Sequence, residues 1–325
     1  MKTFEDICKM TQHEVKVYMK GYLSSKKYKP IDEDGFLYAK GTVPVLLVAH
    51  MDTVHHEQCK EIINRNGKMS SPQGIGGDDR CGIFIIMNLV KELNCSVLLC
   101  EDEEKGTVGA KKFTKTEYIK NLDVNYMIEF DRKNSSDAVF YTCDNKEFIN
   151  FVTDVTGFKQ ATGSFSDIST LMPVAGLSAV NLSCGYYNAH HVTEYVIYDE
   201  MMDTVEAAKV LIKEECEKPF EYIKKEYKFT GSYASFNNNH SSAQYYYEDD
   251  CFENLFDEPN DFSGHDLAEM AKNDTELELE VITYGHDLGE KALYANGSTK
   301  AECWMAMFLE NPNLCFNDIV DYSWN

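Results

Sequence analysis

The 325-residue sequence lacks several features that mark common classes of protein. No apolar run reaches the roughly 18 residues that a membrane-spanning helix needs, and the first residues contain no apolar stretch typical of a secretory leader. The eleven cysteines are odd in number, scattered and free of CxxC or CxxxC spacing. Such cysteines are typical of reduced thiols. We therefore expect a soluble, cytoplasmic protein without a membrane partner.

Positive charge is also scarce. The chain has 31 Lys and Arg against 54 Asp and Glu, which gives a formal net charge of -23. Such a charge argues against nucleic acid or anionic lipid as the main partner. The acid is unevenly placed, because residues 231–325 contain 19 acidic residues against 3 lysines. The sequence therefore predicts a distinct acidic C-terminal part.

Runs of apolar residues and helical spacing of apolar residues indicate the fold class. The runs at 44–49, 95–100, 124–128 and 177–182 predict strands, and the first is continuously apolar, as in strands that are covered on both faces. Helical spacing of apolar residues covers 3–22, 81–93 and 200–215. Strands that alternate with helices predict an α/β sandwich.

Five groups of acidic and histidine residues follow predicted strands or begin predicted helices. They are His50 with Asp52, Asp78 with Asp79, Glu103 with Glu104, Asp131, and His190. Open α/β sheets bind their ligands beyond the carboxyl ends of the strands. We therefore expect these side chains to meet at one edge of the sheet.

The residue types and spacings suit divalent metal ions. Asp52 lies two residues after His50, on the same side of an extended chain, where it can hydrogen-bond the second imidazole nitrogen. Asp78 sits in a glycine-flanked turn, where the backbone can bend sharply and bring a carboxylate close to two cations. Nitrogen and oxygen donors without thiolates suit zinc, with manganese or cobalt as alternatives.

Such a site can hydrolyse an amide bond. Two divalent ions roughly 3.5–4 Å apart lower the pKa of a water molecule that they share. A carboxylate beside that water can accept its proton and pass it to a leaving amine. Glu103 and Glu104 are neighbours on a segment expected to be extended, so we expect them to point in opposite directions, one to a metal and one to the water.

The order of these groups resembles the di-zinc peptidase and amidohydrolase superfamily, which includes zinc aminopeptidases. Its pattern is H-x-D, G-x-D-D, E-E-x-G-x-x-G-A, a lone D, and H-x-x-x-E. The counterparts in this chain run from His50-Met51-Asp52 through Gly76–Asp79, Glu103–Ala110 and Asp131 to His190–Glu194. The resemblance covers about residues 1–215. It implies a three-layer αβα sandwich with a mixed, mostly parallel central sheet.

The resemblance also implies a role for each matching residue. Asp78 would bridge two metal ions; His50 and Asp131 would bind one of them, and Glu104 and His190 the other. Glu103 would be the general base, and Asp52 would orient His50. The peptide bond between Asp78 and Asp79 is often cis in this family.

Two ligand assignments stay open in the sequence, and one segment departs from many relatives. Glu129, on the same side of its strand, competes with Asp131, and His191 competes with His190. His55 and His56 are interpreted as exposed loop residues. Only about 59 residues separate Asp131 from His190, and most of them look strand-like. Many relatives insert a lid domain of roughly 100 residues there, so we expect a catalytic domain without a lid.

These observations predict a metallopeptidase-like catalytic domain at 1–218, a linker or surface loop at 219–250, and an acidic region at 251–325. A short helix at 266–270 and a strand at 277–284 are expected in the last region. Aminopeptidase is the leading interpretation, because members of the family without a lid mostly have that activity. The alternatives are a deacylase or carboxypeptidase of small N-acyl substrates, and a non-catalytic binding relative.

Overall fold

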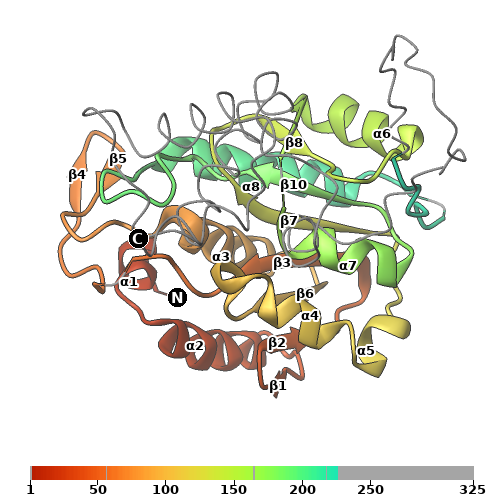
Figure 1. The fold of residues 1–325 in the computed structure, drawn as a ribbon, viewed down its shortest axis with the longest axis horizontal. Helices are drawn as coiled ribbons and strands as arrows, with labels where there is room; N and C mark the ends of the chain where they lie inside the picture. The colour runs from red at the N-terminus through yellow and green to blue at the C-terminus, as the bar shows by residue number, and fades with distance from the viewer. Residues whose placement is uncertain (1, 56, 164, 217, 226–325) are drawn as a thin grey trace, which may run out of the picture. The chain divides into compact units, whose positions relative to one another are not determined.

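The computed structural model describes residues 2–225, apart from 56, 164 and 217 (Figure 1). The chain divides into two units, Met1–Tyr227 and Lys228–Asn325. The predicted acidic region 251–325, with its expected helix and strand, lies outside the described residues. Within the described part, no helix combines the length and the apolar character needed to cross a bilayer.

An eight-stranded mixed sheet forms the centre of the described unit. In spatial order its strands are β1 (Ile31–Glu33), β2 (Phe36–Ala39), β6 (Cys95–Cys100), β3 (Val43–His50), β7 (Tyr126–Arg132), β10 (Ala179–Ser183), β8 (Asp137–Val139) and β9 (Lys159–Ala161). The four central strands are parallel, whereas β2 and β8 run antiparallel to the central strands beside them. The four strands predicted from apolar runs are confirmed as β3, β6, β7 and β10.

Helices cover both faces of the sheet and make the expected three-layer sandwich (Figure 1). On one face, α3 (Gly77–Leu89) packs on β3 and β7 and contacts α8 (Tyr198–Lys213). On the other, α7 (Asp167–Ala175) packs on β3, β7 and β10 and contacts α4 (Val108–Phe113) and α5 (Glu117–Lys120). The helices predicted at 81–93 and 200–215 are confirmed, although α3 begins and ends four residues earlier.

The N-terminal segment forms two helices, so the prediction of one continuous helix over 3–22 is wrong. α1 (Phe4–Cys8) ends before α2 (Gln12–Ser25) begins. The Thr11 side chain accepts the backbone N–H of Glu14, and the Glu14 carboxylate accepts the N–H of Thr11. This capping box starts a new helix, while the apolar spacing continues across the break and conceals it.

The sequence predicted that the segment between Asp131 and His190 is mainly strand-like, and this prediction is also wrong. It contains α6 (Lys146–Thr156) as well as α7. Phe148 and Val152 lie one helical turn apart and both are buried, and Asn145 caps the N-terminus of α6. The helices and strands of this segment belong to the central sheet and its covering layers. Its described residues therefore form no inserted lid domain.

A second, four-stranded antiparallel sheet lies beside the first turn of α3. Its strands are β11 (Tyr186–Tyr187), β12 (Tyr195–Ile197), β5 (Lys68–Ser70) and β4 (Ile63–Arg65), in that order. A Cβ atom added at Gly77 would lie 2.8 Å from Tyr186 Cβ and 2.8 Å from Val196 Cγ2. Glycine at this position allows the close approach of the strands to the turn. The approach brings the loop that carries His190 to the turn that carries Asp78.

Residues 218–225 pack on the same unit. Phe220 is buried, and its backbone N–H donates to the carbonyl of Asn125. Tyr222 N–H donates to the carbonyl of Gly176. The first residues of the segment predicted as a linker, 219–225, therefore contact the domain, and the rest of that segment lies outside the described residues.

Candidate metal centre

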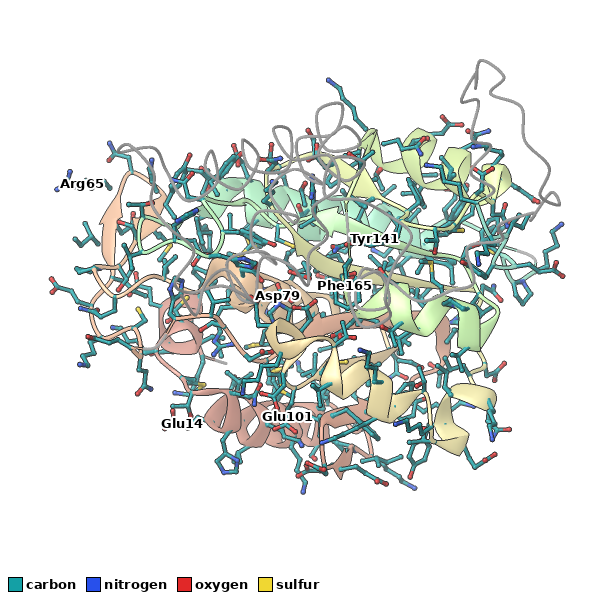
Figure 2. The ribbon with its side chains drawn as sticks, viewed as in Figure 1. Glu14, Arg65, Asp79, Glu101, Tyr141 and Phe165 are labelled. Atoms are coloured by element: carbon teal, nitrogen blue, oxygen red, sulfur yellow. The ribbon has the colours of Figure 1, made fainter. Side chains whose placement is uncertain are left out.

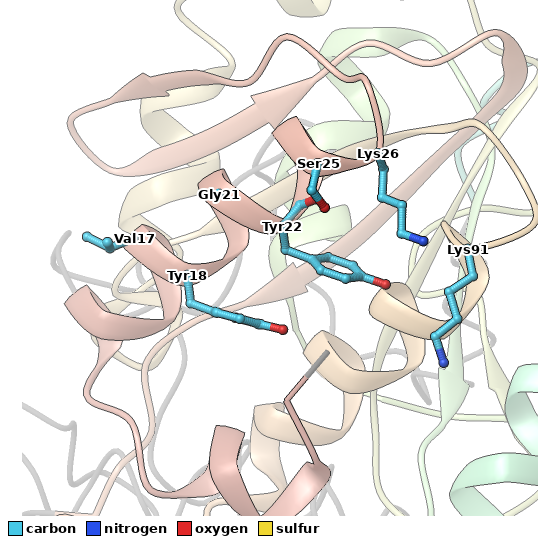
Figure 3. Close-up of a pocket in the computed structure, with 7 residues that line it drawn as sticks. All are labelled: Val17, Tyr18, Gly21, Tyr22, Ser25, Lys26 and Lys91. Carbon is cyan, nitrogen blue, oxygen red and sulfur yellow. The ribbon is translucent and has the colours of Figure 1, made fainter.

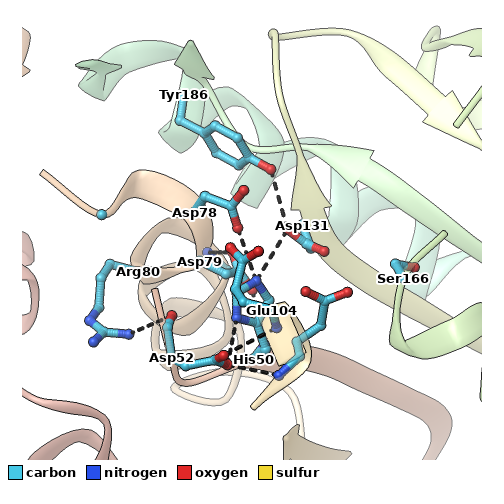
Figure 4. A network of polar contacts seen from close by, with 12 residues as sticks. His50, Asp52, Asp78, Asp79, Arg80, Glu104, Asp131, Ser166 and Tyr186 are labelled. Carbon is cyan, nitrogen blue, oxygen red and sulfur yellow. Dashed lines mark hydrogen bonds and ion pairs between the residues drawn. The ribbon is translucent and has the colours of Figure 1, made fainter. Parts of the chain in front are cut away.

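His50 ends β3, and its ring is buried. Its Nδ1 lies 3.1 Å from Asp52 Oδ1, the contact that the spacing of the two residues predicts (Figure 4). The Asp52 carboxylate also accepts the backbone N–H groups of Glu103, at 3.0 Å, and Glu104, at 3.1 Å. Asp52 therefore fixes both the imidazole ring and the turn that carries the two glutamates.

Asp78 lies between two histidines. Its Oδ1 is 2.9 Å from His50 Nε2, and its Oδ2 is 3.2 Å from His190 Nε2. The peptide bond from Asp78 to Asp79 is cis, as the resemblance implies. Asp79 is buried inside the domain (Figure 2), where its carboxylate accepts the N–H groups of His50 and Gly82. Asp78 is thus the member of the pair that faces the histidines.

Glu103 and Glu104 follow β6 in a 3₁₀ helix, Glu103–Lys105, and not on the extended segment that we predicted. Successive residues of a 3₁₀ helix are about 120° apart around its axis, so neighbours need not point in opposite directions. Oxygens of both carboxylates and a ring nitrogen of His50 lie within 4.8 Å of one another. Glu104 Oε1 is 3.3 Å from His190 Nε2, yet it is buried and accepts no hydrogen bond from the described residues.

Asp131, and not Glu129, lies beside His50. Asp131 Oδ1 is 3.5 Å from His50 Nε2 and accepts the hydroxyl of Tyr186 at 3.2 Å (Figure 4). Glu129 is fully buried and accepts the hydroxyl of Ser166. The geometry therefore favours Asp131 as the ligand.

His190, and not His191, faces the carboxylates. Its side chain is 55% exposed, but Nε2 approaches both Asp78 and Glu104. His191 is exposed, and its backbone N–H donates to Asn188. The side chain of His190 therefore forms the solvent-exposed side of the cluster.

The donor atoms form two triads that share Asp78. The first triad is His50 with the Asp78 and Asp131 oxygens that contact its Nε2, and the second is Asp78, Glu104 and His190. An oxygen of Asp79 also lies within 4.8 Å of donor atoms of His50 and Asp131. The contacts within them measure 2.9–3.5 Å. Ligand atoms arranged tetrahedrally at about 2.0–2.1 Å from a zinc ion lie about 3.3 Å apart. The donor set, its spacing and the buried Glu104 oxygen that accepts no hydrogen bond from the described residues fit a divalent metal cofactor.

The cluster has an excess of buried carboxyl groups, and their pKa values reflect it. Burial raises the pKa of Glu103 and Glu104, and burial together with the charge of Asp78 raises that of Asp131 to about 7. The adjacent carboxylates of Asp78 and Glu104 raise the pKa of His190 to about 11. Burial alone would raise the pKa of Asp78, but its hydrogen bonds with the two histidines lower it. A bound cation would offset the same negative charge.

Arg80, whose role the sequence did not reveal, lies buried beside the centre. Its guanidinium donates to the backbone carbonyls of Met51, Asp52 and Met10. Figure 4 shows Arg80 next to Asp52. Burial lowers the pKa of Arg80, and the charges of nearby acidic groups oppose that shift. Its position directly after the aspartate pair was the only signal in the sequence.

The prediction that His55 is an exposed loop residue is wrong, because only 8% of its side chain is accessible. Its Nε2 lies 2.8 Å from Glu194 Oε2. The prediction for His56 lies outside the described residues. The sequence pattern contains Glu194 but does not reveal its contact with His55.

A separate hollow of about 560 Å³ lies along α2 (Figure 3). Its walls are Val17, Tyr18, Gly21, Tyr22, Ser25, Lys26 and Lys91. None of these residues belongs to either triad. The candidate chemistry therefore does not depend on this hollow.

No protein-family model and no curated protein matches the sequence. Solved structures resemble it. Aminopeptidase PepT from Bacillus cereus has a TM-score of 0.54 at 13% identity, over 64% of this chain and 96% of that one. A tripeptidase from Staphylococcus aureus has a TM-score of 0.52 at 12% identity, over 65% and 97%. An aminopeptidase from the archaeon Desulfurococcus kamchatkensis has a TM-score of 0.50 at 13% identity, over 65% and 94%. The chain therefore shares the fold of these peptidases, as its motifs predict.

Proposed function

We propose that this chain, which has an aminopeptidase fold, is a metal-dependent hydrolase of peptide or related amide bonds and acts as an aminopeptidase. The observation that carries the proposal is that Asp78 contacts both His50 and His190. Asp131 lies beside the first histidine, Glu104 lies beside the second, and Glu103 lies close to His50 and Glu104. The structural neighbours named aminopeptidases and tripeptidase support the same reaction class.

The residues of the two triads would hold two divalent ions, zinc in the first instance and manganese or cobalt as alternatives. His50 and Asp131 would bind one ion, Glu104 and His190 the other, and Asp78 both. The ions, when bound, supply Lewis-acid activation of water and of the scissile carbonyl.

Glu103 acts as the general base. In this proposal it accepts a proton from the attacking water and donates it to the leaving amine, so that the amine leaves as a neutral group. Its backbone N–H is held by Asp52, which also holds His50. One aspartate thus fixes the positions of the base and of a metal ligand relative to each other.

A substrate panel on the full-length chain tests the proposal. Purified protein loaded with zinc or manganese is assayed with aminoacyl anilides and with N-acyl amino acids. We expect hydrolysis of the anilides and a loss of at least about 100-fold in Glu103→Ala, with metal still bound. Glu117→Ala is the control, because the Glu117 side chain is 75% exposed and pairs only with Lys120 among the described ion pairs.

Two results would overturn parts of the proposal. Full activity in Glu103→Ala would remove Glu103 as the base. Cleavage of N-acyl amino acids without cleavage of aminoacyl anilides would replace the aminopeptidase by a deacylase.

A further inference from the structure

Glu194 is a fully buried carboxylate that contacts the turn before Asp78 and not the donor atoms themselves. Its Oε2 accepts the backbone N–H of Gly76 at 2.9 Å. Its Oε1 accepts the backbone N–H of Asp78 at 3.0 Å. Each oxygen therefore holds one end of the three-residue turn that leads to the shared aspartate.

His55 provides the third donor to this carboxylate. Its Nε2 lies 2.8 Å from Glu194 Oε2, and its ring lies against Gly74. A Cβ atom at Gly74 would come within 2.3 Å of that ring. Glycine at this position therefore makes room for the ring that meets Glu194.

The direction of a backbone N–H restricts the direction of the side chain on the same residue, because both are fixed by the backbone around one Cα. Glu194 fixes the N–H of Asp78, so it also restricts where the Asp78 carboxylate can point. That carboxylate has two separate contacts, one oxygen to His50 and the other to His190. A small rotation of the turn would change both contacts together.

We propose that Glu194, held by His55, is a positioning residue for Asp78 and thereby controls metal affinity at both triads at once. This inference rests on the proposed metal centre. The competing interpretation is local: Glu194 lies four residues after His190 and would support only the loop of the second triad. The two interpretations differ in the number of sites that a substitution weakens.

Glutamine in place of Glu194 is the informative substitution. The carboxylate accepts three donors on two oxygens, whereas a glutamine amide has one acceptor oxygen and one N–H₂ donor group. One end of the amide would therefore direct a donor at a backbone N–H. Loss of such supporting hydrogen bonds typically lowers metal affinity by about 10–100-fold.

Calorimetric titration of the metal-free, full-length protein with zinc separates the two interpretations. We expect two binding events in the wild type, one in His190→Ala, and two events that are both weakened by about 10–100-fold in Glu194→Gln. Weakening of one event only would establish the local interpretation and overturn ours. Unchanged affinity in Glu194→Gln would also overturn it.

Further variants keep the test valid if Glu194→Gln folds poorly. His55→Ala should weaken both events in the same direction, and His55→Gln, which restores a donor, should recover part of the loss. Glu200→Gln is the matched control, because the Glu200 carboxylate also accepts a hydrogen bond, from the hydroxyl of Tyr187 on β11. If His55→Ala binds zinc as the wild type does, His55 has no part in positioning and the inference fails. A wild type that binds no metal would instead contradict the proposed function.

Discussion

Asp52 contacts three separate parts of the centre through one carboxylate. It receives the ring of His50 and the backbone N–H groups of Glu103 and Glu104. An ionised carboxylate can accept all three donors, whereas an asparagine amide offers a single acceptor atom. The exchange of one oxygen for N–H₂ therefore disturbs both the ring of His50 and the turn that carries Glu103, the proposed metal ligand and the proposed base.

We predict that Asp52→Asn lowers metal affinity and kcat/KM by about 10–100-fold each. Zinc titration and initial-rate kinetics measure the two effects. Asp34→Asn is the control, since the side chain of Asp34 is 92% exposed and contacts Lys112 at the surface. Wild-type affinity and kcat/KM in Asp52→Asn would contradict the positioning role of this residue.

We predict that Arg80→Met destabilises the fold by about 1.5–3 kcal/mol, the range typical of hydrogen bonds that involve a charged group. The substitution leaves the carbonyls of Met51 and Met10 without a donor and the nearby acids without a counter-charge. Urea denaturation measures the change, with Lys105→Met at the surface as the control. Equal midpoints for Arg80→Met and the wild type would show that the buried guanidinium is dispensable.

At the scale of elements, the centre forms where the second sheet meets the first turn of α3. Tyr186, on β11, donates to Asp131 of β7, and Val196, on β12, packs against Gly77. One short strand therefore contacts Asp131 near the end of β7, and the other contacts the start of α3 beside Asp78. The closeness of this contact depends on the absence of a side chain at Gly77.

We predict that Gly77→Ala destabilises the protein by about 1–3 kcal/mol, as overpacking of a tight contact does, and weakens metal binding. Gly21→Ala is the matched comparison, because a Cβ atom there meets nothing within 4 Å and the residue lies inside α2. That change should stabilise the helix by about 0.5–1 kcal/mol. Thermal unfolding of both variants measures the contrast, and equal effects would contradict the packing argument.

At the scale of the whole described unit, the sequence predicts the sheet and its helical layers better than it predicts the side-chain contacts around the metal centre. Apolar runs, the first of them continuous, identify β3, β6, β7 and β10 because these strands are covered on both faces. The short strands β11 and β12 carry no such run, and their place depends on packing against Gly77. The donors of the triads follow from the order of the motifs. Partners such as Arg80 and Tyr186 do not, since tertiary contacts alone bring them to the centre.

The metal-free molecule should lose stability as the pH rises from 5 to 8. Asp131 and Asp167 are buried carboxyls whose pKa values are raised by burial, in each case to about 7 from an ordinary value of 3.8. The folded state therefore binds their protons more tightly than the unfolded state. This contribution to stability is complete below about pH 4 and is lost as the pH rises through about 7.

Melting temperatures at pH 5 and pH 8, with chelator and with zinc, measure this effect. We expect a fall between the two values in chelator and a smaller fall with zinc, because a bound cation stabilises the ionised form of Asp131. A melting temperature that rises from pH 5 to pH 8 in chelator would contradict the sign of the shift.

If Asp78 joins two metal sites, as we propose, the number of bound ions depends on its carboxylate. The full-length protein and its Asp78→Asn variant are loaded with zinc, desalted, and measured by elemental mass spectrometry with far-ultraviolet circular dichroism to check folding. We expect two ions per wild-type chain and fewer than one in folded Asp78→Asn. One ion or none in the wild type, or two in the variant, would contradict the proposal.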